Sequence, residues 1–171
     1  MNRAQVMSEL KRLVLQKPRL TLAVAESMTC GWVQARVGGI SGASHFFLGG
    51  ITAYTLDEKV RHLGVDRATA RRANCVSALV AEQMARGVCG LFESNVGVAT
   101  TGFAEPSPDD DVTEPFAWWA LVHRRENAIA MRRGRVEFPG ATRVNAQKRV
   151  ADAVLTELVG YLAEFREGAK R

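Results

Sequence analysis

The chain has few cysteines and no long apolar stretch. Its 171 residues include Cys30, Cys75 and Cys89, whose spacing fits neither a metal-binding motif nor a disulfide framework. We therefore expect free thiols in a reducing cytoplasm. No apolar run reaches the length of a membrane span, and the N-terminal residues lack the hydrophobic core of a secretory signal. Both observations disfavour a membrane protein and an exported one.

The sequence also lacks the patterns of nucleic-acid binding. The formal net charge is +5 and the isoelectric point is near 9.5, but the arginines are scattered in small groups. Aromatic residues are not interleaved with them, and no zinc-finger or RNA-binding motif is present. We expect most of these arginines to lie on solvated faces, so no nucleic-acid partner is predicted.

What the sequence does contain is one alternation of strand and helix patterns. A hydrophobic content of 47% suffices for a single core, and no repeat or composition break divides residues 1–171. Apolar periodicity and breakers predict helices at 3–16, 30–37, from 57, at 67–72, after Ser77 and at 141–165. They predict strands at 20–25, 46–54, 95–100, 116–123 and 128–137.

This order predicts an α/β fold. We expect one domain, a three-layer α/β/α sandwich with a mostly parallel, partly antiparallel sheet. The last two strands should be joined by a tight turn at 125–127. The helix after Ser77 should bury Val80, Met84, Val88 and Leu91. The segment 102–115 reads as one long acidic loop, a kind of loop that is usually functional or mobile.

Residues 20–31 carry the clearest indication of chemistry. An apolar run stops at Glu26, and Ser27, Thr29 and Cys30 follow before a helical pattern begins. A helix start offers free backbone N–H groups to an anion, and a nucleophile beside them is placed for acyl transfer. A serine or threonine here can equally be a helix cap. Both interpretations remain open from this stretch alone.

Two further polar segments follow strands. If the three strands concerned are parallel neighbours, residues 26–30, 54–59 and the loop from Thr101 share one edge of the sheet, where α/β proteins bind ligands. By default Lys59 would be a solvated surface lysine and Tyr54 a half-buried packing residue.

These segments resemble those of the CinA C-terminal domain family, the nicotinamide mononucleotide deamidases. Ala25-Glu-Ser-Met-Thr-Cys-Gly31 is similar to the family's A-E-S-C-T-G-G turn. The likeness continues in the family's order through Ser41-Gly-Ala-Ser44, Phe47-Leu-Gly-Gly-Ile-Thr-Ala-Tyr54, Asp57-Glu-Lys59, Leu63-Gly-Val65, Val76-Ser77, Thr101-Gly-Phe-Ala104 and Phe138-Pro-Gly140. It covers nearly the whole chain.

The resemblance implies hydrolysis of the nicotinamide mononucleotide amide, or of a related amide, to the acid and ammonia. It implies a serine nucleophile, Ser27, assisted by Tyr54 and Lys59, with no metal and no cofactor. The matching substrate-binding candidates are Glu26, Thr29, Cys30, Gly31, Thr101, Gly102 and Arg143. Glu26 would orient the lysine or bind substrate, or else favour a helix N-terminus. We further expect a small-molecule substrate and a homo-oligomer.

The chain departs from the family pattern mainly in the acidic loop. Cys30 replaces a glycine of the turn, and Glu105 replaces a glycine after the third strand. Further along, Glu114 replaces a lysine and Ala117 a glycine. Added carboxylates would repel a phosphorylated substrate, which predicts altered substrate choice or lost activity.

Three functional hypotheses follow. The chain is an amidohydrolase acting on nicotinamide mononucleotide, an amidohydrolase acting on a less anionic amide, or a catalytically weak or inactive paralogue that serves as a binding or assembly subunit. A thiolate mechanism through Cys30 is a further alternative. It is disfavoured because the sequence places none of the three histidines beside that residue.

Overall fold

The computed structural model describes residues 1–125 and 128–168 of the chain. Its helices are α1 (Arg3–Leu15), α2 (Trp32–Gly38), α3 (Leu56–Leu63), α4 (Arg67–Arg72), α5 (Ala78–Phe92) and α6 (Arg143–Gly168). Its strands are β1 (Leu22–Glu26), β2 (Phe47–Thr52), β3 (Val96–Phe103), β4 (Phe116–Arg124) and β5 (Ile129–Glu137). None of the described helices combines the length and the apolarity needed to cross a membrane.

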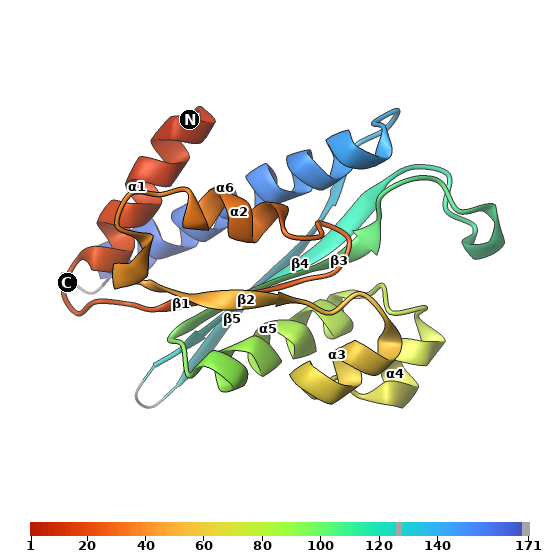
Figure 1. Ribbon diagram of the computed structural model, residues 1–171, viewed down its shortest axis with the longest axis horizontal. Helices are drawn as coiled ribbons and strands as arrows, with labels where there is room; N and C mark the ends of the chain where they lie inside the picture. The colour runs from red at the N-terminus through yellow and green to blue at the C-terminus, as the bar shows by residue number, and fades with distance from the viewer. Residues whose placement is uncertain (126–127, 169–171) are drawn as a thin grey trace.

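The five strands form one sheet in the order β2-β1-β3-β4-β5. The strands β2, β1 and β3 run parallel, whereas β4 and β5 continue the sheet as an antiparallel hairpin. Helices α1, α2 and α6 cover one face, and α3, α4 and α5 cover the other (Figure 1). The predicted α/β/α sandwich is therefore confirmed, with one half of the sheet parallel and the other antiparallel.

Each face of the sheet carries its own apolar core. The first core joins α1, α2 and α6 around Leu10, Leu155 and Phe46, all fully buried. The second joins α5 to the sheet through Val80, Met84 and neighbouring alanines. Strand β1 is buried along its whole length, as expected for a central strand covered on both faces.

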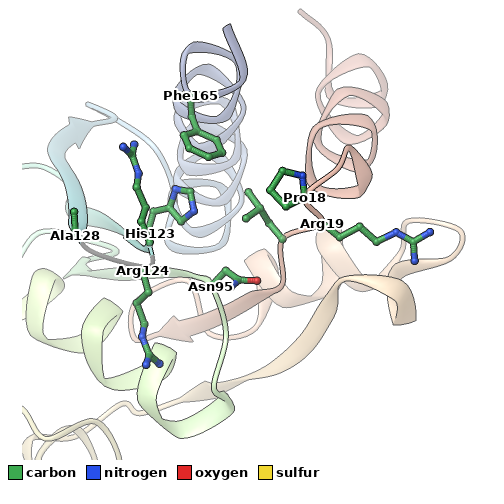
Figure 2. A pocket seen from close by; sticks show the side chains of 9 residues that line it. Pro18, Arg19, Asn95, His123, Arg124, Ala128 and Phe165 are labelled. Atoms are coloured by element: carbon green, nitrogen blue, oxygen red, sulfur yellow. The ribbon is translucent and has the colours of Figure 1, made fainter. Parts of the chain in front are cut away.

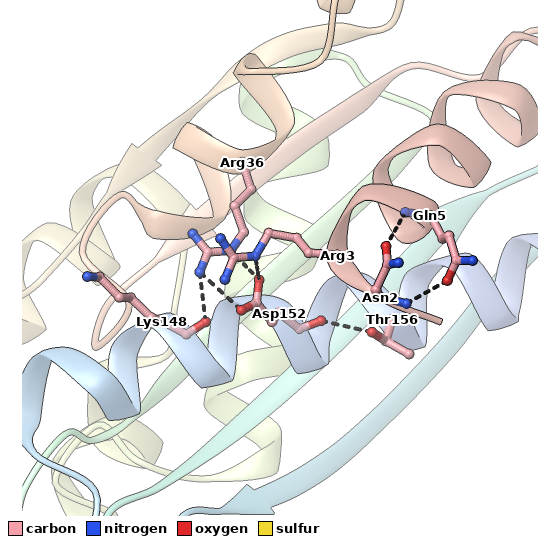
Figure 3. Close-up of polar contacts among 7 residues, drawn as sticks. All are labelled: Asn2, Arg3, Gln5, Arg36, Lys148, Asp152 and Thr156. Carbon is pink, nitrogen blue, oxygen red and sulfur yellow. Dashed lines mark hydrogen bonds and ion pairs between the residues drawn. The ribbon is translucent and has the colours of Figure 1, made fainter.

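Polar contacts tie α1 and α2 to the long helix α6. Asp152 of α6 accepts hydrogen bonds from Arg36, including one of 3.2 Å from Nη2 to Oδ2, and pairs with Arg3 at 3.2 Å (Figure 3). The Arg36 side chain is only 8% exposed, so its charge needs this partner. Near the other end of α6, the buried Arg166 donates to the carbonyls of Leu13, Gln16 and Pro18, which caps the end of α1.

Two details differ from the sequence-based expectations. Leu91 is 49% exposed, so its assignment to the inner side of α5 is wrong, and the neighbouring Cys89 is buried instead. The acidic segment is partly ordered, because β3 runs to Phe103 and Ser107 pairs with Val112 around a 3₁₀ turn at Pro108–Asp110. This segment projects beyond the sheet (Figure 1). The predicted turn at 125–127 lies largely outside the described residues.

Candidate active site

The candidate site lies at the carboxyl ends of the parallel strands. Glu26, the last residue of β1, pairs with Thr52 of β2 on one side and with Thr100 of β3 on the other. The chain leaves β1 toward α2 on one face and leaves β2 toward α3 on the opposite face. Such a switch point opens a crevice beyond the strand ends. Ser27 follows β1 at this point, and residues 54–59 follow β2, as the sequence predicted.

Ser27 and Lys59 meet at the switch point. The Lys59 ammonium group donates to Ser27 Oγ at 2.9 Å and to the backbone carbonyl of Tyr54 at 2.8 Å. Thr55 caps α3 by accepting from the N–H of Glu58, and Lys59 lies one turn into that helix on its inner side. Lys59 is 1% exposed and Ser27 is 7% exposed. The surface-lysine interpretation is therefore wrong, and the buried amine lies within hydrogen-bond distance of the serine hydroxyl.

Burial changes the acidity of the lysine. Loss of hydration disfavours the charged ammonium and lowers the pKa of Lys59 below its ordinary value of 10.5, while the nearby Cys75 thiol acts in the opposite direction. A lysine with a lowered pKa is more often the neutral amine near neutral pH. In that form it can accept the proton of the serine hydroxyl with which it already shares a hydrogen bond.

The start of α2 is not a free anion site. The carboxylate of Glu26, fully buried, accepts hydrogen bonds from the N–H groups of Gly31 (2.9 Å), Val33 (3.1 Å) and Gln34 (2.8 Å). The prediction that these donors await an external anion is thus wrong, because a carboxylate of the chain occupies them. Glu26 caps the helix, which is one of the roles that the sequence left open for it, and within the described residues no hydrogen bond joins it to Lys59.

Other residues proposed from the sequence as substrate contacts bond to the protein itself. Thr29 is fully buried and its hydroxyl lies 2.7 Å from that of Thr100. Thr101 is 1% exposed and donates to the carbonyl of Cys75 at 2.7 Å. A Cβ on Gly102 would lie 2.2 Å from the carbonyl oxygen of Phe116, so glycine here permits the close pairing of β3 with β4.

Three of the candidates face solvent, namely Cys30, Tyr54 and Arg143. Cys30 is exposed, and it and Gly31 both adopt positive φ angles, 48° and 97°. Arg143, the first residue of α6, donates from Nη2 to the Tyr54 hydroxyl at 2.7 Å and pairs through Nη1 with Glu105. Tyr54 thus meets Lys59 through its backbone carbonyl, whereas its phenol group lies against Arg143.

Cys75 is a residue of this site that sequence reasoning missed. It follows Asn74, and both adopt positive φ angles, 42° and 63°. Its N–H donates to Ala70 at 2.7 Å, and its carbonyl accepts from Thr101. This irregular turn brings the thiol near enough to Lys59 to act on its charge. Asn74 was the only local indication, since asparagine tolerates the left-handed conformation.

A cavity of about 580 Å³ lies at the opposite ends of the strands, away from Ser27. Its lining includes Asn95, which precedes β3, and His123 of β4 (Figure 2). His123 is 3% exposed, lies 2.9 Å from the Tyr161 hydroxyl through Nδ1, and packs edge-on against Phe165. Burial and the positive charges of Arg125 and Arg166 lower the pKa of His123 to about 4.

Fold and site together define a three-layer α/β/α domain with a buried serine–lysine pair at its switch point. The model of the CinA C-terminal domain matches residues 4–162. The chain belongs to this family, as the resemblance of its motifs indicated.

Relatives and solved structures agree with this assignment. A CinA-like protein of Chlorobium limicola is 37% identical over 153 residues, which cover 88% of this chain and 35% of that protein. A CinA-like protein of Salinibacter ruber is 45% identical over 108 residues, which cover 61% of this chain and 26% of that protein. The chain therefore spans about a third or less of the length of these curated relatives.

The fold itself is shared with solved structures of low sequence identity. The crystal structure of competence damage-inducible protein A from Klebsiella pneumoniae aligns with a TM-score of 0.86 at 22% identity, covering 95% of this chain and 98% of that one. Competence/damage inducible protein CihA from Agrobacterium tumefaciens aligns with a TM-score of 0.75 at 24% identity, covering 91% and 94% of the two chains.

Proposed function

We propose that this chain is an amidohydrolase that converts the amide of a nicotinamide nucleotide, or of a related compound, to the acid and ammonia. The single observation that supports it most is the 2.9 Å contact between Ser27 Oγ and the buried Lys59 Nζ. A serine hydroxyl is a weak nucleophile unless a base removes its proton, and a desolvated lysine is such a base. Family membership supplies the expected reaction.

In the first half of the reaction Ser27 Oγ attacks the amide carbonyl carbon. Lys59, as the neutral amine, takes the hydroxyl proton, and the carbonyl π electrons move to oxygen to form a tetrahedral oxyanion. When the intermediate collapses, the C–N bond breaks and Lys59 returns its proton to the departing nitrogen, which leaves as ammonia. Ser27 is then an ester of the acid product.

In the second half water replaces the amine. Lys59 is again neutral and removes a proton from a water molecule that attacks the ester carbonyl. Collapse of the second tetrahedral intermediate breaks the bond between the carbonyl carbon and Ser27 Oγ, and Lys59 returns the proton to the serine. The acid is released, and the serine–lysine pair regains its starting protonation.

Oxyanion stabilisation would fall to the turn rather than to the start of α2. Glu26 already occupies the N–H groups of Gly31, Val33 and Gln34. Within residues 1–125 and 128–168, the backbone N–H groups of Met28 and Thr29 have no hydrogen-bond partner. Both groups directly follow the proposed nucleophile Ser27 in the chain, and backbone N–H groups beside a nucleophile are the usual donors to a developing oxyanion.

A second candidate function is a binding or assembly subunit with weak or no catalysis. The contact of Arg143 with both Tyr54 and Glu105 favours it, because it holds the phenol group away from the serine–lysine pair. In either case we place the protein in the cytoplasm as a homo-oligomer, a setting that its three free thiols suit.

The proposed function is tested by ammonia release from nicotinamide mononucleotide and a panel of related amides. We expect Ser27→Ala to reduce turnover by about 10³–10⁶-fold without unfolding the protein, because a catalytic unit fails when its nucleophile is removed. The matched control is Ser8→Ala at an exposed position of α1. Mass spectrometry of a slowly deacylating substrate should place the acyl group on Ser27. Full activity of Ser27→Ala would refute the mechanism.

The lowered pKa of Lys59 gives a second test. Because the neutral amine is the active form, kcat/KM should rise with pH and level off at an apparent pKa below 10.5, the ordinary value for lysine. Lys59→Arg should abolish this rise along with the activity, since a guanidinium stays protonated throughout the range.

A further inference from the structure

Three segments distant in sequence meet beside the proposed reacting pair. Tyr54 follows β2, Arg143 opens α6, and Glu105 lies in the acidic segment after β3. Arg143 Nη2 donates to the Tyr54 hydroxyl at 2.7 Å, and Nη1 of the same guanidinium pairs with Glu105. All three side chains reach solvent, since Tyr54 is 48% exposed and the side chains of Arg143 and Glu105 are 45% and 54% exposed. Arg143 links the other two side chains into a row, and this row is tied to the site through the bond between Lys59 and the Tyr54 carbonyl.

Arg143 is the cation of this row, and its charge is already balanced. An arginine recognises a phosphate by presenting two parallel N–H donors to two oxygens. In this chain one end of that fork is taken by the Glu105 carboxylate and the other by the Tyr54 hydroxyl. A phosphate approaching Arg143 would have to displace Glu105 and then remain close to a carboxylate of like charge.

The rest of the acidic segment adds to this charge. Residues 104–115 contain Glu105, Asp109, Asp110, Asp111 and Glu114 and no lysine or arginine. Glu114 is directed elsewhere, because its carboxylate accepts from the N–H of Gly140 at 2.9 Å. Asp110 likewise accepts from Asn74 and Ser107. Glu105 is therefore the carboxylate of this segment that directly meets the residues of the site.

We propose that Glu105 sets the substrate class: the amide that this chain binds carries no phosphate at the Arg143 end, and is a neutral or cationic compound such as a nucleoside rather than a nucleotide. The inference rests on the proposed function for the position of the reacting amide. Glu105 is a specificity determinant that acts through Arg143, and it touches neither Ser27 nor Lys59 in the structure.

The test separates binding from turnover. In a Ser27→Ala background, the nicotinamide nucleotide and the corresponding nucleoside without phosphate are titrated calorimetrically at low salt. We expect the protein that retains Glu105 to bind the nucleoside at least about tenfold more tightly than it binds the nucleotide. Glu105→Gly should shift the ratio of the two dissociation constants by about tenfold toward the nucleotide. Because all three side chains are solvated, the shift should shrink in high salt.

The matched control removes the same charge from the same segment at a different place. Asp109 is exposed and makes no side-chain hydrogen bond within the described residues, so Asp109→Asn should leave the ratio within about twofold. If both substitutions changed the ratio equally, the cause would be the general charge of the loop, and the specific role of Glu105 would be refuted. Tighter binding of the nucleotide by the protein that retains Glu105, or binding of neither compound, would overturn the inference.

Ammonia release by the protein that retains Ser27 is measured separately, so that a failure of this inference can be distinguished from a failure of the proposed function. A protein that releases ammonia but prefers the nucleotide refutes only the substrate class. A protein that binds the nucleoside and releases no ammonia from either compound refutes only the proposed reaction.

Discussion

The two ends of the parallel strands each hold a buried base, in different surroundings. At the carboxyl ends Lys59 donates to the hydroxyl of Ser27 beside an irregular turn. At the amino ends His123 is enclosed by Tyr161 and Phe165 near a cavity of about 580 Å³. Burial lowers the pKa of both groups. The lysine faces a nucleophile, whereas the histidine faces a phenol that also binds Arg125.

This difference shows that neither a cavity nor a shifted pKa identifies a catalytic group by itself. Burial and neighbouring charges shift the pKa values of groups with a purely structural role as much as those of catalytic groups. What distinguishes the Lys59 end is a hydroxyl within proton-transfer distance at the switch point of the sheet. Substitutions at the two ends should therefore separate activity from stability.

The largest expected effect is that of Lys59→Met. We expect ammonia release to fall by about 10³-fold or more, because the base is lost. The melting temperature should change by only a few degrees, because removing the desolvated ammonium favours the folded state and losing its hydrogen bonds to Ser27 and Tyr54 disfavours it. Each kcal/mol corresponds to roughly 2–4 °C for a chain of this size.

The control for this substitution is Lys17→Met at an exposed position, which should change neither quantity appreciably. Calorimetric melting and ammonia release measured on the same preparations decide the outcome. Retained activity of Lys59→Met would contradict the proposed role of Lys59 as the base and leave it with a structural role, like that of His123.

The next largest effect concerns His123 and acid stability. Its pKa is about 4 in the folded state, against an ordinary value of 6.5, so the unfolded chain binds more protons between these values. The free energy of unfolding should decrease as pH falls from 6.5 to about 4, by up to about 3 kcal/mol from this group. In His123→Phe the free energy of unfolding should fall less over this pH range, because the contribution of the histidine is absent.

Urea unfolding at pH 7 and pH 4 measures this pH dependence. His62→Gln is the control, since His62 is 40% exposed and pairs with Glu58 on the surface of α3. Ammonia release at neutral pH should be nearly the same in His123→Phe and the unmodified chain. A large loss of activity in His123→Phe would mean that the two ends of the sheet are coupled.

A smaller effect is expected for Thr101→Val. The Thr101 hydroxyl is buried and donates to the carbonyl of Cys75, which holds the irregular turn near Lys59. Losing one buried hydrogen bond should reduce the free energy of unfolding by about 1–2 kcal/mol. The control is Thr156→Val, which removes an exposed hydroxyl-to-carbonyl bond of similar length. Equal effects of the two would show that the turn is held by other contacts.

The smallest expected effect is that of Cys30→Ser. Cys30 is exposed near Ser27, the proposed nucleophile, but makes no hydrogen bond from its thiol within the described residues. Ammonia release should stay within about threefold of the unmodified chain. Loss of activity in Cys30→Ser would indicate that the Cys30 thiol, rather than Ser27, is the nucleophile.

Much of the fold was predictable because its elements have strong local determinants. The helices at 3–16 and 67–72 and the cap at Ser77 were predicted to within a residue or two. Leu91 shares the side of α5 that carries the buried Val80 and Met84, yet it is 49% exposed. Helical spacing assigns a residue to one side of a helix, but it does not tell whether another element covers the last turn of that side.

The contact of Ser27 with Lys59 was predictable from strand order together with family resemblance. The sequence left the capping role of Glu26 open as one alternative. The pairing of Arg143 with Glu105 was not predictable, because it depends on side-chain directions and joins residues 38 positions apart. The position of Cys75 near Lys59 also lacks a sequence pattern, since it results from two successive residues in an uncommon backbone conformation.

The capping bonds of Glu26 have a consequence for how functions are assigned to relatives. Glu26 and Ser27 are neighbours in one short motif, yet the first residue secures a helix and the second is proposed to react. A descendant that lost its reactivity would still need the glutamate to fold. A sequence search that scores the glutamate-containing turn would therefore give active enzymes and inactive paralogues similar scores. The lysine five residues after Tyr54 is the more discriminating position to inspect, because its buried amine contacts the serine hydroxyl and serves the proposed reaction rather than the capping of a helix.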